Sequence, residues 1–266
     1  MSAFIALPHR CLLTISGEDR RSFLQGLVSA DAEKASSPQY GALLTPQGKY
    51  LYDFFLAELD GVLLLEVEAA GREDFIKRLS RFRLRSKVTL AAKDDWQVYA
   101  ILGDGAVTGG FVFTDPRLIE AGRRAWLPAP PDLPQADFSD WDVHRIALGL
   151  ADGSRDMVPE KTILLEAGFD ELHGVDWQKG CFMGQEVTAR SKYRGQIKKR
   201  LLPVEIDGPP PEAGAILTLD GQEAGEMRSH AGRMGLAVIR LDALDRGPLM
   251  SGETQLTPKI PAWVKL

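Results

Sequence analysis

With 266 residues, 44% of them hydrophobic and 26% charged, the chain has the balance of a globular protein that forms one large domain or two ordinary ones. Its formal net charge of −5 provides no general attraction to nucleic acid or to anionic membranes, so we expect neither as a direct partner. The two cysteines, Cys11 and Cys181, are too few for a disulfide framework and fit a reducing compartment. We therefore expect a cytoplasmic protein.

The first part of the chain alternates predicted strands with two predicted helices. Residues 11–16 give an apolar strand signal, and residues 17–28 give a helical one with apolar side chains on one face. A second amphipathic helix is predicted at 72–82. This order of elements predicts an α+β fold with helices on one face of a sheet. Further strands are predicted at 42–45, 50–58, 62–67, 88–91 and 96–102, with a hairpin turn at 60–61.

The second part changes character near residue 200. A helix with Ser139 as N-cap is predicted at 139–148, and another helix at 185–193. Beyond them, short strand signals between glycine-rich turns predict a small β-barrel or sandwich. The chain therefore divides into an α+β region at 1–200 and a β domain at 201–266. The predicted strands of that domain are 201–206, 215–219, 235–240 and 262–265.

One segment carries a distinctive combination of reactive and small residues. Residues 179–186 read Lys-Gly-Cys-Phe-Met-Gly-Gln-Glu and place Cys181 in a compact polar loop. A thiol beside cations and a helix N-terminus is stabilised as the thiolate, which is the reactive and metal-binding form. Gly180 and Gly184 allow backbone amides to approach a ligand, because neither has a Cβ. The simpler interpretation is a tight turn whose small residues only pack, and the composition of the loop leaves both open.

Charged residues crowd around this loop. Lys179 precedes the cysteine and Arg190 and Arg194 follow it, so the three cations are candidates to face an anionic ligand. Glu186 lies at the expected start of a helix, where the helix dipole favours a carboxylate. An ion pair between Glu186 and Arg190, four residues on, is the simplest interpretation. The alternative is that Gln185 and Glu186 orient a ligand or the loop itself.

A second candidate site lies near residue 50. The segment Thr45-Pro46-Gln47-Gly48-Lys49 reads as a β-turn, and the strand that follows carries Asp53 between apolar residues. A carboxylate in such a strand either faces solvent or is buried with a partner. A buried position would favour a functional role for Asp53.

Other catalytic patterns are missing from the sequence. The four histidines show no metal-ligand spacing and there is no Cys-x-x-Cys pair, so we predict no resident metal site. Neither a nucleophile elbow nor a P-loop occurs, which disfavours acyl transfer and nucleotide hydrolysis.

The motif at 179–186, continued by Thr188-Ala189-Arg190 and Arg194-Gly195, resembles the signature of the YgfZ-type folate-binding proteins. That family includes bacterial proteins and their mitochondrial iron–sulfur assembly relatives. The resemblance extends over nearly the whole chain, because further matching blocks lie at 15–27, 44–53, 145–160 and 235–237.

The resemblance implies the fold of the glycine-cleavage T-protein, with a tetrahydrofolate-binding α+β region followed by a small C-terminal β-barrel. It implies a bacterial, cytoplasmic factor that binds tetrahydrofolate or a derivative and supports assembly or repair of iron–sulfur proteins, including radical enzymes that modify tRNA. Its partners would be folate and iron–sulfur assembly or client proteins, with a transient iron–sulfur cluster at the thiol.

By the same resemblance, Cys181 is the functional thiol and Asp53 a catalytic candidate. The chain departs from the T-protein at two positions: Ala147 stands where that protein has a pterin-gripping glutamate, and Tyr52 where it has a second aspartate before Asp53. Both departures argue against a working aminomethyltransferase. The implied cofactor-binding residues are Gly48, Lys49, Lys179, Gly180, Gly184, Gln185, Glu186, Arg190 and Arg194.

Three hypotheses follow. The first is a folate-binding iron–sulfur assembly factor with Cys181 as its thiol. The second is a folate-dependent one-carbon transferase, for which Asp53 is the local candidate for the required base. The third is an interaction module without a small-molecule ligand. A thermal shift with tetrahydrofolate separates the third from the other two.

Overall fold

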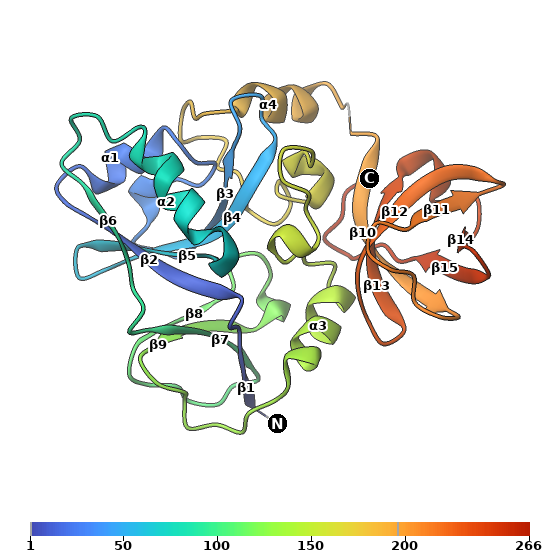
Figure 1. Ribbon diagram of the computed structural model, residues 1–266, viewed down its shortest axis with the longest axis horizontal. Coiled ribbons are helices and arrows are strands. Elements are labelled where there is room, and N and C mark those ends of the chain that lie inside the picture. Colours follow the sequence, from blue (N-terminus) through green and yellow to red (C-terminus); the bar gives the residue numbers. More distant parts are fainter. Residues whose placement is uncertain (1, 196) are drawn as a thin grey trace.

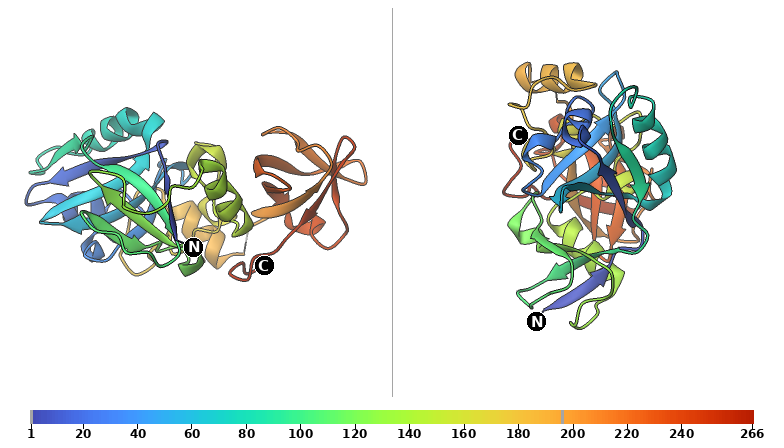
Figure 2. Two further views of the ribbon diagram at one scale, coloured as in Figure 1. Left: turned by 90° about the horizontal axis from the view of Figure 1, so that it is seen from below. Right: turned by 90° about the vertical axis from the view of Figure 1, so that its left-hand side faces the viewer.

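The computed structural model describes residues 2–195 and 197–266 of the chain. An α+β region occupies one end of an elongated molecule and a β-barrel the other (Figure 1). Between them lies a connecting layer of helical segments, residues 138–167. The left view of Figure 2 shows the same division from below. Within the described ranges, no helix combines the length and the apolar character needed to cross a membrane.

The α+β region is built on a five-stranded antiparallel sheet. Helices α1 (Arg20–Gln25) and α2 (Arg72–Ser80) pack their apolar side chains on one face of it. In β4, Phe54 faces these helices and the next residue, Phe55, faces the opposite core, because successive side chains of a strand point to opposite faces. The strand order is β3 (Gln39–Leu44), β4 (Tyr50–Leu59), β5 (Val62–Glu68), β2 (Arg10–Ser16) and β6 (Thr89–Ala92).

A second, four-stranded antiparallel sheet shares a hydrophobic core with the first. Its Trp126 packs with Phe55 of the first sheet and with Trp141 of helix α3 (Phe138–Ala147) in the largest hydrophobic core. Short 3₁₀ helices occur at η1 (Ala32–Lys34), η2 (Ala69–Gly71), η3 (Ile119–Ala121), η4 (Gly153–Arg155) and η5 (Leu164–Ala167). The sheet has the order β1 (Ala3–Ala6), β7 (Gln97–Leu102), β9 (Arg123–Leu127) and β8 (Phe111–Thr114).

Helix α4 (Gln185–Tyr193) leads into the C-terminal barrel, which has its own apolar interior. The barrel is closed, which leaves no unpaired sheet edge. A sixth 3₁₀ helix, η6 (Leu241–Ala243), follows one of its strands. Around the barrel the strands are β10 (Lys199–Asp207), β13 (Met234–Arg240), β12 (Gln222–Ala231), β11 (Ile216–Leu219), β14 (Leu249–Ser251) and β15 (Thr254–Pro258).

Three expectations from the sequence were wrong in detail. The helix expected at 17–28 is only α1, because Val28 already pairs with Leu43 in a β-bridge. Helix α3 begins at Phe138, and Asp137 rather than Ser139 is its N-cap, through a capping box with Asp140.

The segment expected as a strand at 262–265 is irregular. Its Trp263 turns back to the connecting layer, where the indole Nε1 donates a hydrogen bond of 2.8 Å to the Leu148 carbonyl. The strands β14 and β15 close the barrel instead.

Candidate functional site

The loop that carries Cys181 is shaped by two glycines with positive φ. Gly180 has φ of +92° and Gly184 has φ of +81°, a region that residues with a Cβ rarely adopt. A Cβ on Gly180 would meet open space, whereas one on Gly184 would lie 2.5 Å from the carbonyl oxygen of Thr45. Gly184 therefore allows the loop to approach the 45–49 turn closely.

The close approach of Gly184 to the 45–49 turn joins two of the candidate sites, the turn itself and the loop at 179–186. A Cβ on Gly48 would lie 2.6 Å from the carbonyl oxygen of Gly184 and 2.8 Å from the Cβ of Val187 in α4. The Thr45–Lys49 turn thus packs directly on the start of α4. Protein atoms fill the space beside Gly48 and Gly184, so both glycines position the loop.

Lys179 anchors the loop from the other side. Its ammonium donates a hydrogen bond of 2.6 Å to the carbonyl of Val28 and another to that of Ala30. Burial lowers the pKa of Lys179 to about 8, against the opposing pull of nearby carboxylates. The lysine therefore points into the segment after α1, and its charge holds backbone in place.

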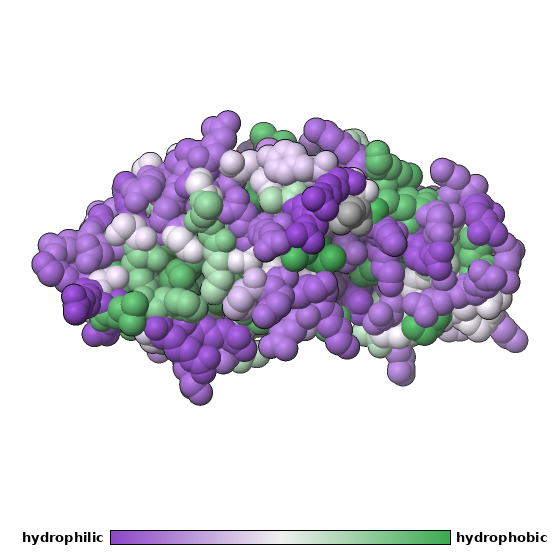
Figure 3. Space-filling view, turned by 90° about the horizontal axis from the view of Figure 1, so that it is seen from above, coloured by the Kyte–Doolittle hydropathy of each residue, from purple (hydrophilic) through white to green (hydrophobic). Residues whose placement is uncertain are grey.

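Cys181 itself is exposed and forms no disulfide. It lies in an open groove together with Pro46, Arg190, Tyr193 and Arg194. Figure 3 shows this upper face, where apolar and hydrophilic areas alternate over the α+β region. An exposed thiol among arginines can be reached by a protein-sized partner.

The polar residues at the start of α4 are mostly engaged with each other. The amide oxygen of Gln185 accepts a hydrogen bond of 3.1 Å from the backbone N–H of Phe182 and closes the turn. Glu186 and Arg190 form an exposed ion pair of 2.7 Å, which is the simplest interpretation of their spacing. Arg194 ends the helix, and its backbone N–H donates to the carbonyl of Arg190 at 3.0 Å.

Lys49 belongs to the turn that supports this loop. Its backbone N–H donates to the hydroxyl of Thr45 at 3.1 Å, and its carbonyl accepts from the backbone N–H of Thr45 at 2.8 Å. Its ammonium lies near Glu166, whose pKa is raised by burial. Lys49 therefore closes the turn through its backbone.

Asp53 does not join the Cys181 loop. It lies on β4, 2% exposed, where one carboxylate oxygen accepts 3.0 Å from Arg10 and the other 3.4 Å from the hydroxyl of Tyr40. Both oxygens of this carboxylate therefore already accept a hydrogen bond from a neighbouring side chain. The sequence left open whether Asp53 is exposed or buried, and the structure shows it buried with a guanidinium partner.

Asp53 is part of a buried charge cluster that sequence reasoning missed. Glu66 accepts from Arg10 at 3.1 Å, from Arg124, and from the indole Nε1 of Trp126 at 2.8 Å. Each carboxylate in the cluster pairs with a guanidinium, which is the condition under which buried charges are tolerated. The cluster consists of Arg10, Asp53, Glu66, Asp115, Arg117 and Arg124.

Asp115 shows the strength of this pairing. Burial alone would raise its pKa, but Arg117 and Arg124 lower the pKa of Asp115 to about 2. Its carboxylate accepts from Arg117 at 2.8 Å and from Arg124 at 3.1 Å. The carboxylate therefore stays charged at neutral pH.

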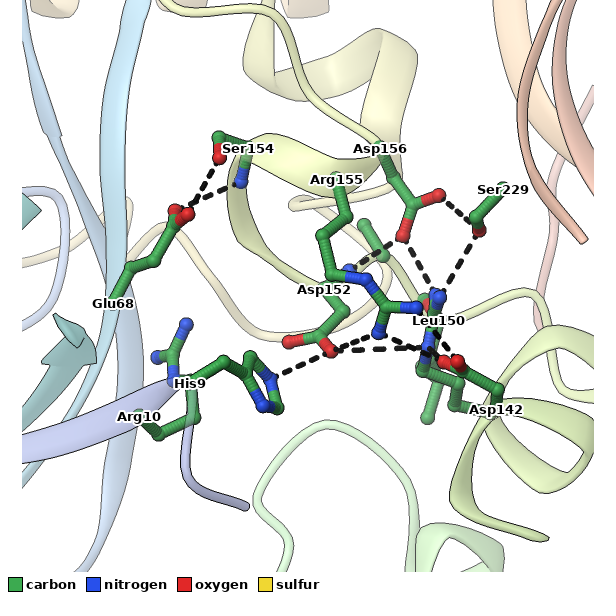
Figure 4. A network of polar contacts seen from close by, with 12 residues as sticks. His9, Arg10, Glu68, Asp142, Leu150, Asp152, Ser154, Arg155, Asp156 and Ser229 are labelled. Carbon is green, nitrogen blue, oxygen red and sulfur yellow. Dashed lines mark hydrogen bonds and ion pairs between the residues drawn. The ribbon is translucent and has the colours of Figure 1, made fainter. Parts of the chain in front are cut away.

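A second polar network ties the connecting layer to the barrel (Figure 4). Arg145 of α3 donates to Asp156 at 2.6 Å and to the hydroxyl of Ser229 on β12 at 3.0 Å. The guanidinium of Arg155 bonds Asp142 and Asp152, as Figure 4 shows. These contacts fix the barrel against α3.

A cavity of about 240 Å³ lies between this layer and the barrel. It is lined by three cations, Lys161, Lys199 and Arg228, and by three carboxylates, Asp156, Glu166 and Glu226, and Glu226 is ion-paired with Arg228. Within the described ranges, the buried Nε of Arg228 has no hydrogen-bond partner, so one donor remains for an anionic ligand. This lining offers the carboxylates of a folate tail two lysines and one free donor of Arg228, and pockets that enclose such ligands are larger, about 300–1,000 Å³. The cavity therefore fits only part of the molecule.

Known proteins are similar to this chain along nearly its whole length. The family model of the CAF17 C-terminal beta-barrel domain matches residues 198–266. The human protein named iron-sulfur cluster assembly factor IBA57, mitochondrial, is 31% identical, and the match covers 98% of this chain and 85% of that protein. The mouse protein of the same name is 32% identical over 97% of this chain and 84% of its own length.

The chain belongs to the IBA57 family of iron–sulfur cluster assembly factors. A fungal member from Pyricularia oryzae is 31% identical over 91% of this chain and 73% of its own. The expectation of a cytoplasmic protein was wrong by this comparison, since these IBA57 relatives are named as mitochondrial. A low cysteine content fits any reducing compartment and cannot distinguish one from another.

The IBA57-family chain also has the fold that the sequence predicted. The glycine cleavage system aminomethyltransferase T from Bartonella henselae superposes with a TM-score of 0.78, over 99% of this chain and 86% of that one. At 16% sequence identity this likeness concerns the fold alone. The T-protein-like α+β region with a C-terminal barrel is thereby confirmed.

Proposed function

We propose that this protein supports the assembly of iron–sulfur proteins, with Cys181 as the thiol that binds cluster iron during transfer. The observation that carries the proposal is the exposed Cys181 on a loop fixed by Lys179 and by the Gly48–Gly184 contact. The names of its IBA57 relatives support the same role. Binding requires the thiol to lose its proton to solvent, after which the thiolate donates an electron pair to iron.

A partner protein must supply the remaining cluster ligands. Iron–sulfur clusters are held by four ligands, usually cysteine thiolates. Within residues 2–195 and 197–266, no group of three His, Cys, Asp or Glu side chains is arranged to hold a metal ion. Cys11 lies on β2, partly buried against the α1–α2 side of the sheet. One chain therefore contributes a single thiolate, and the cluster is cargo shared with another protein.

Tetrahydrofolate, implied by the resemblance of residues 179–186 to the YgfZ-type signature, forms a second part of the proposal. The cavity beside the barrel supports it, because Lys161, Lys199 and the free Nε of Arg228, whose guanidinium also pairs with Glu226, would face the carboxylates of the glutamate tail. When bound, the folate carries one-carbon units.

The competing function, one-carbon transfer on folate, finds less support. It requires a base, and the carboxylate of Asp53 is buried and occupied by Arg10 and Tyr40. The glutamate that grips the pterin in the T-protein is also replaced by Ala147, the last residue of α3.

Replacement of each cysteine tests the proposed thiol. In cells that lack the gene, Cys181→Ser should fail to restore the activity of iron–sulfur enzymes, whereas Cys11→Ser, the matched control, should restore it. Circular dichroism of both purified variants should match the parent protein, because serine has nearly the size of cysteine and neither thiol is fully buried. Full restoration by Cys181→Ser would reject the proposed thiol.

A thermal-shift titration with tetrahydrofolate tests the ligand. Binding to the folded state alone raises the melting temperature with ligand concentration, by about 2.7 kcal/mol of stability at one hundred times Kd. Arg228→Met should abolish the shift, and Arg233→Met, an exposed arginine elsewhere in the barrel, should leave it unchanged. A flat titration of the parent protein contradicts folate binding.

A further inference from the structure

The segment that joins α2 to β6, residues 81–87, combines exposed apolar and basic side chains. It reads Arg-Phe-Arg-Leu-Arg-Ser-Lys, and we name it the 81–87 loop. Leu84 is 90% exposed and Phe82 is 43% exposed, so neither is buried in the fold. Within the described residues, the guanidinium groups of Arg81, Arg83 and Arg85 form no ion pair. Most other arginines of the protein do have a carboxylate partner.

The loop is nevertheless held in a defined shape. The backbone N–H of Ser86 donates 2.7 Å to the carbonyl of Arg83, and that of Lys87 donates 2.7 Å to the carboxylate of Asp19. Leu84 has φ of +41°, a conformation that a leucine adopts only at an energetic cost. The fold thus presents an apolar side chain on a fixed turn with arginines on both sides, and gains no intramolecular burial from it.

This loop lies one short helix away from the Cys181 loop. Lys87 contacts Asp19 directly before α1, and the backbone N–H of Met183 donates 3.0 Å to the carbonyl of Gly26 directly after it. Helix α1 has six residues and is therefore about 9 Å long. Figure 1 shows the α2–β6 connection and α4 along the same upper edge of the molecule. A protein–protein interface of about 800 Å² per partner is wide enough to cover both loops.

We propose that the 81–87 loop is a docking site for the partner protein that meets Cys181, and that this partner has an acidic rim around a small apolar pocket for Leu84. Charge complementarity specifies the rim, because the three arginines of the loop are joined by Arg194 at the other end of the edge, where Arg190 is paired with Glu186. Arginine matches a carboxylate with two parallel hydrogen bonds. Arginine is also enriched among interface hot spots.

A fixed turn favours a protein over a lipid surface. Membrane adsorption depends on buried apolar area and on the number of cations near the surface, and requires no strained backbone. The proposal rests on the proposed function only in identifying the partner as the protein that shares the cluster.

Photo-crosslinking from inside the loop tests the proposal. The full chain with p-benzoylphenylalanine at position 84 is expressed in cells that lack the gene, and covalent adducts are identified by mass spectrometry. The same probe at Ile119, which is 76% exposed in η3 between β8 and β9 of the second sheet, is the matched control. We expect one acidic protein at position 84 and at Tyr193 beside Cys181, but not at position 119.

Charge reversal in the same chain decides whether the contact is specific. Arg81→Glu, Arg83→Glu and Arg85→Glu together should reduce the position-84 adduct by about tenfold or more, as expected for a charged rim. The same reversal at Arg233, Arg240 and Arg246 of the barrel should leave it unchanged. Lipid or nucleic acid as the only adduct, no adduct, or one that survives loop reversal each overturns the proposal.

Failure of this proposal can be distinguished from failure of the proposed function. The adduct at position 84 should persist in Cys181→Ser, because docking does not require the thiol. A charge-dependent adduct in a protein whose Cys181→Ser variant still restores iron–sulfur enzymes would retain the docking site and reject the thiol. The reverse outcome would retain the thiol and reject the docking site.

Discussion

The buried charge cluster around Glu66 and the exposed edge around Cys181 both consist of arginines and carboxylates, but the two sets of side chains differ in their access to solvent. In the cluster, Arg10, Arg124 and their carboxylates are nearly inaccessible and bond to one another. At the edge, the only ion pair of the Cys181 groove, Glu186–Arg190, joins side chains that are 80% and 50% exposed, within the part of the chain that the structure describes. Residue type alone therefore does not identify a site, and access to solvent separates structural charges from those that can meet a partner.

The free-energy cost of breaking an ion pair also differs between the two regions, because it depends on access to solvent. Removal of one partner from a buried ion pair leaves an uncompensated charge in a medium of low dielectric constant, which costs about 3–5 kcal/mol. An exposed pair is screened by water and contributes at most about 1 kcal/mol. Substitutions in the two regions should therefore differ strongly in stability.

The largest effect is expected for Glu66→Ala. This change removes the acceptor shared by Arg10, Arg124 and Trp126, so the free energy of unfolding should fall by about 3–5 kcal/mol in urea denaturation. Glu66→Gln retains part of the hydrogen bonding and should cost less. A loss below about 1 kcal/mol for Glu66→Ala would mean that the cluster does not stabilise the fold.

The next largest effect is expected for Gly184→Ala. The new Cβ would meet the Thr45 carbonyl at 2.5 Å and would also disfavour the positive φ, so the loss should be about 1–3 kcal/mol. Gly180→Ala, with positive φ but open space around the Cβ, is the matched control and should lose about 1 kcal/mol. Equal losses would show that contact with the 45–49 turn contributes nothing.

The two cysteines should differ in reactivity by about tenfold or more, because a thiol reacts only as its thiolate and only when accessible. Burial raises the pKa of Cys11, so its thiolate fraction at pH 7.5 is smaller than for an ordinary thiol and increases as pH rises towards the raised pKa. Cys181 is exposed and should be alkylated first. Intact-mass kinetics with iodoacetamide between pH 7 and 9.5, with each Cys→Ser variant to assign the sites, measures the difference. Comparable rates at pH 7.5 would contradict it.

The smallest effect is expected for Glu186→Ala. It breaks an exposed pair one helical turn apart, so stability should change by less than about 0.5 kcal/mol. Urea denaturation beside Glu66→Ala gives the direct comparison. A loss above about 1 kcal/mol would place Glu186 in a structural role that its exposure does not indicate.

The candidate site was predicted in part from its local pattern. The helix expected at 185–193 is α4 with those bounds, and the hairpin at Asp60-Gly61 has the positive φ values that such a turn requires. Asp53 was recognised as unusual among apolar neighbours, but its partner Arg10 lies 43 residues away in sequence. No periodicity links two such positions.

Long-range pairing also explains where the fold prediction failed. The helical pattern at 17–28 stops after Gln25, because Val28 and Ser29 bond to Leu43 and Ala42 of β3. Strands β1, β8, β9, β12, β14 and β15 were not predicted. All but the ten-residue β12 are short segments of three to five residues whose pairing depends on other strands. The first, β1, pairs with β7, almost a hundred residues later.

The sequence by itself determined the local features: strand and helix signals, the glycine-bracketed Cys181 loop and the change to a β domain near residue 200. These features depend on neighbouring residues, so a short stretch of sequence is enough to predict them. The tertiary structure decided which charges are buried in pairs, that the 45–49 turn meets the Cys181 loop, and that the 81–87 loop remains exposed. Burial and dielectric environment depend on residues distant in sequence, so only the folded chain defines them.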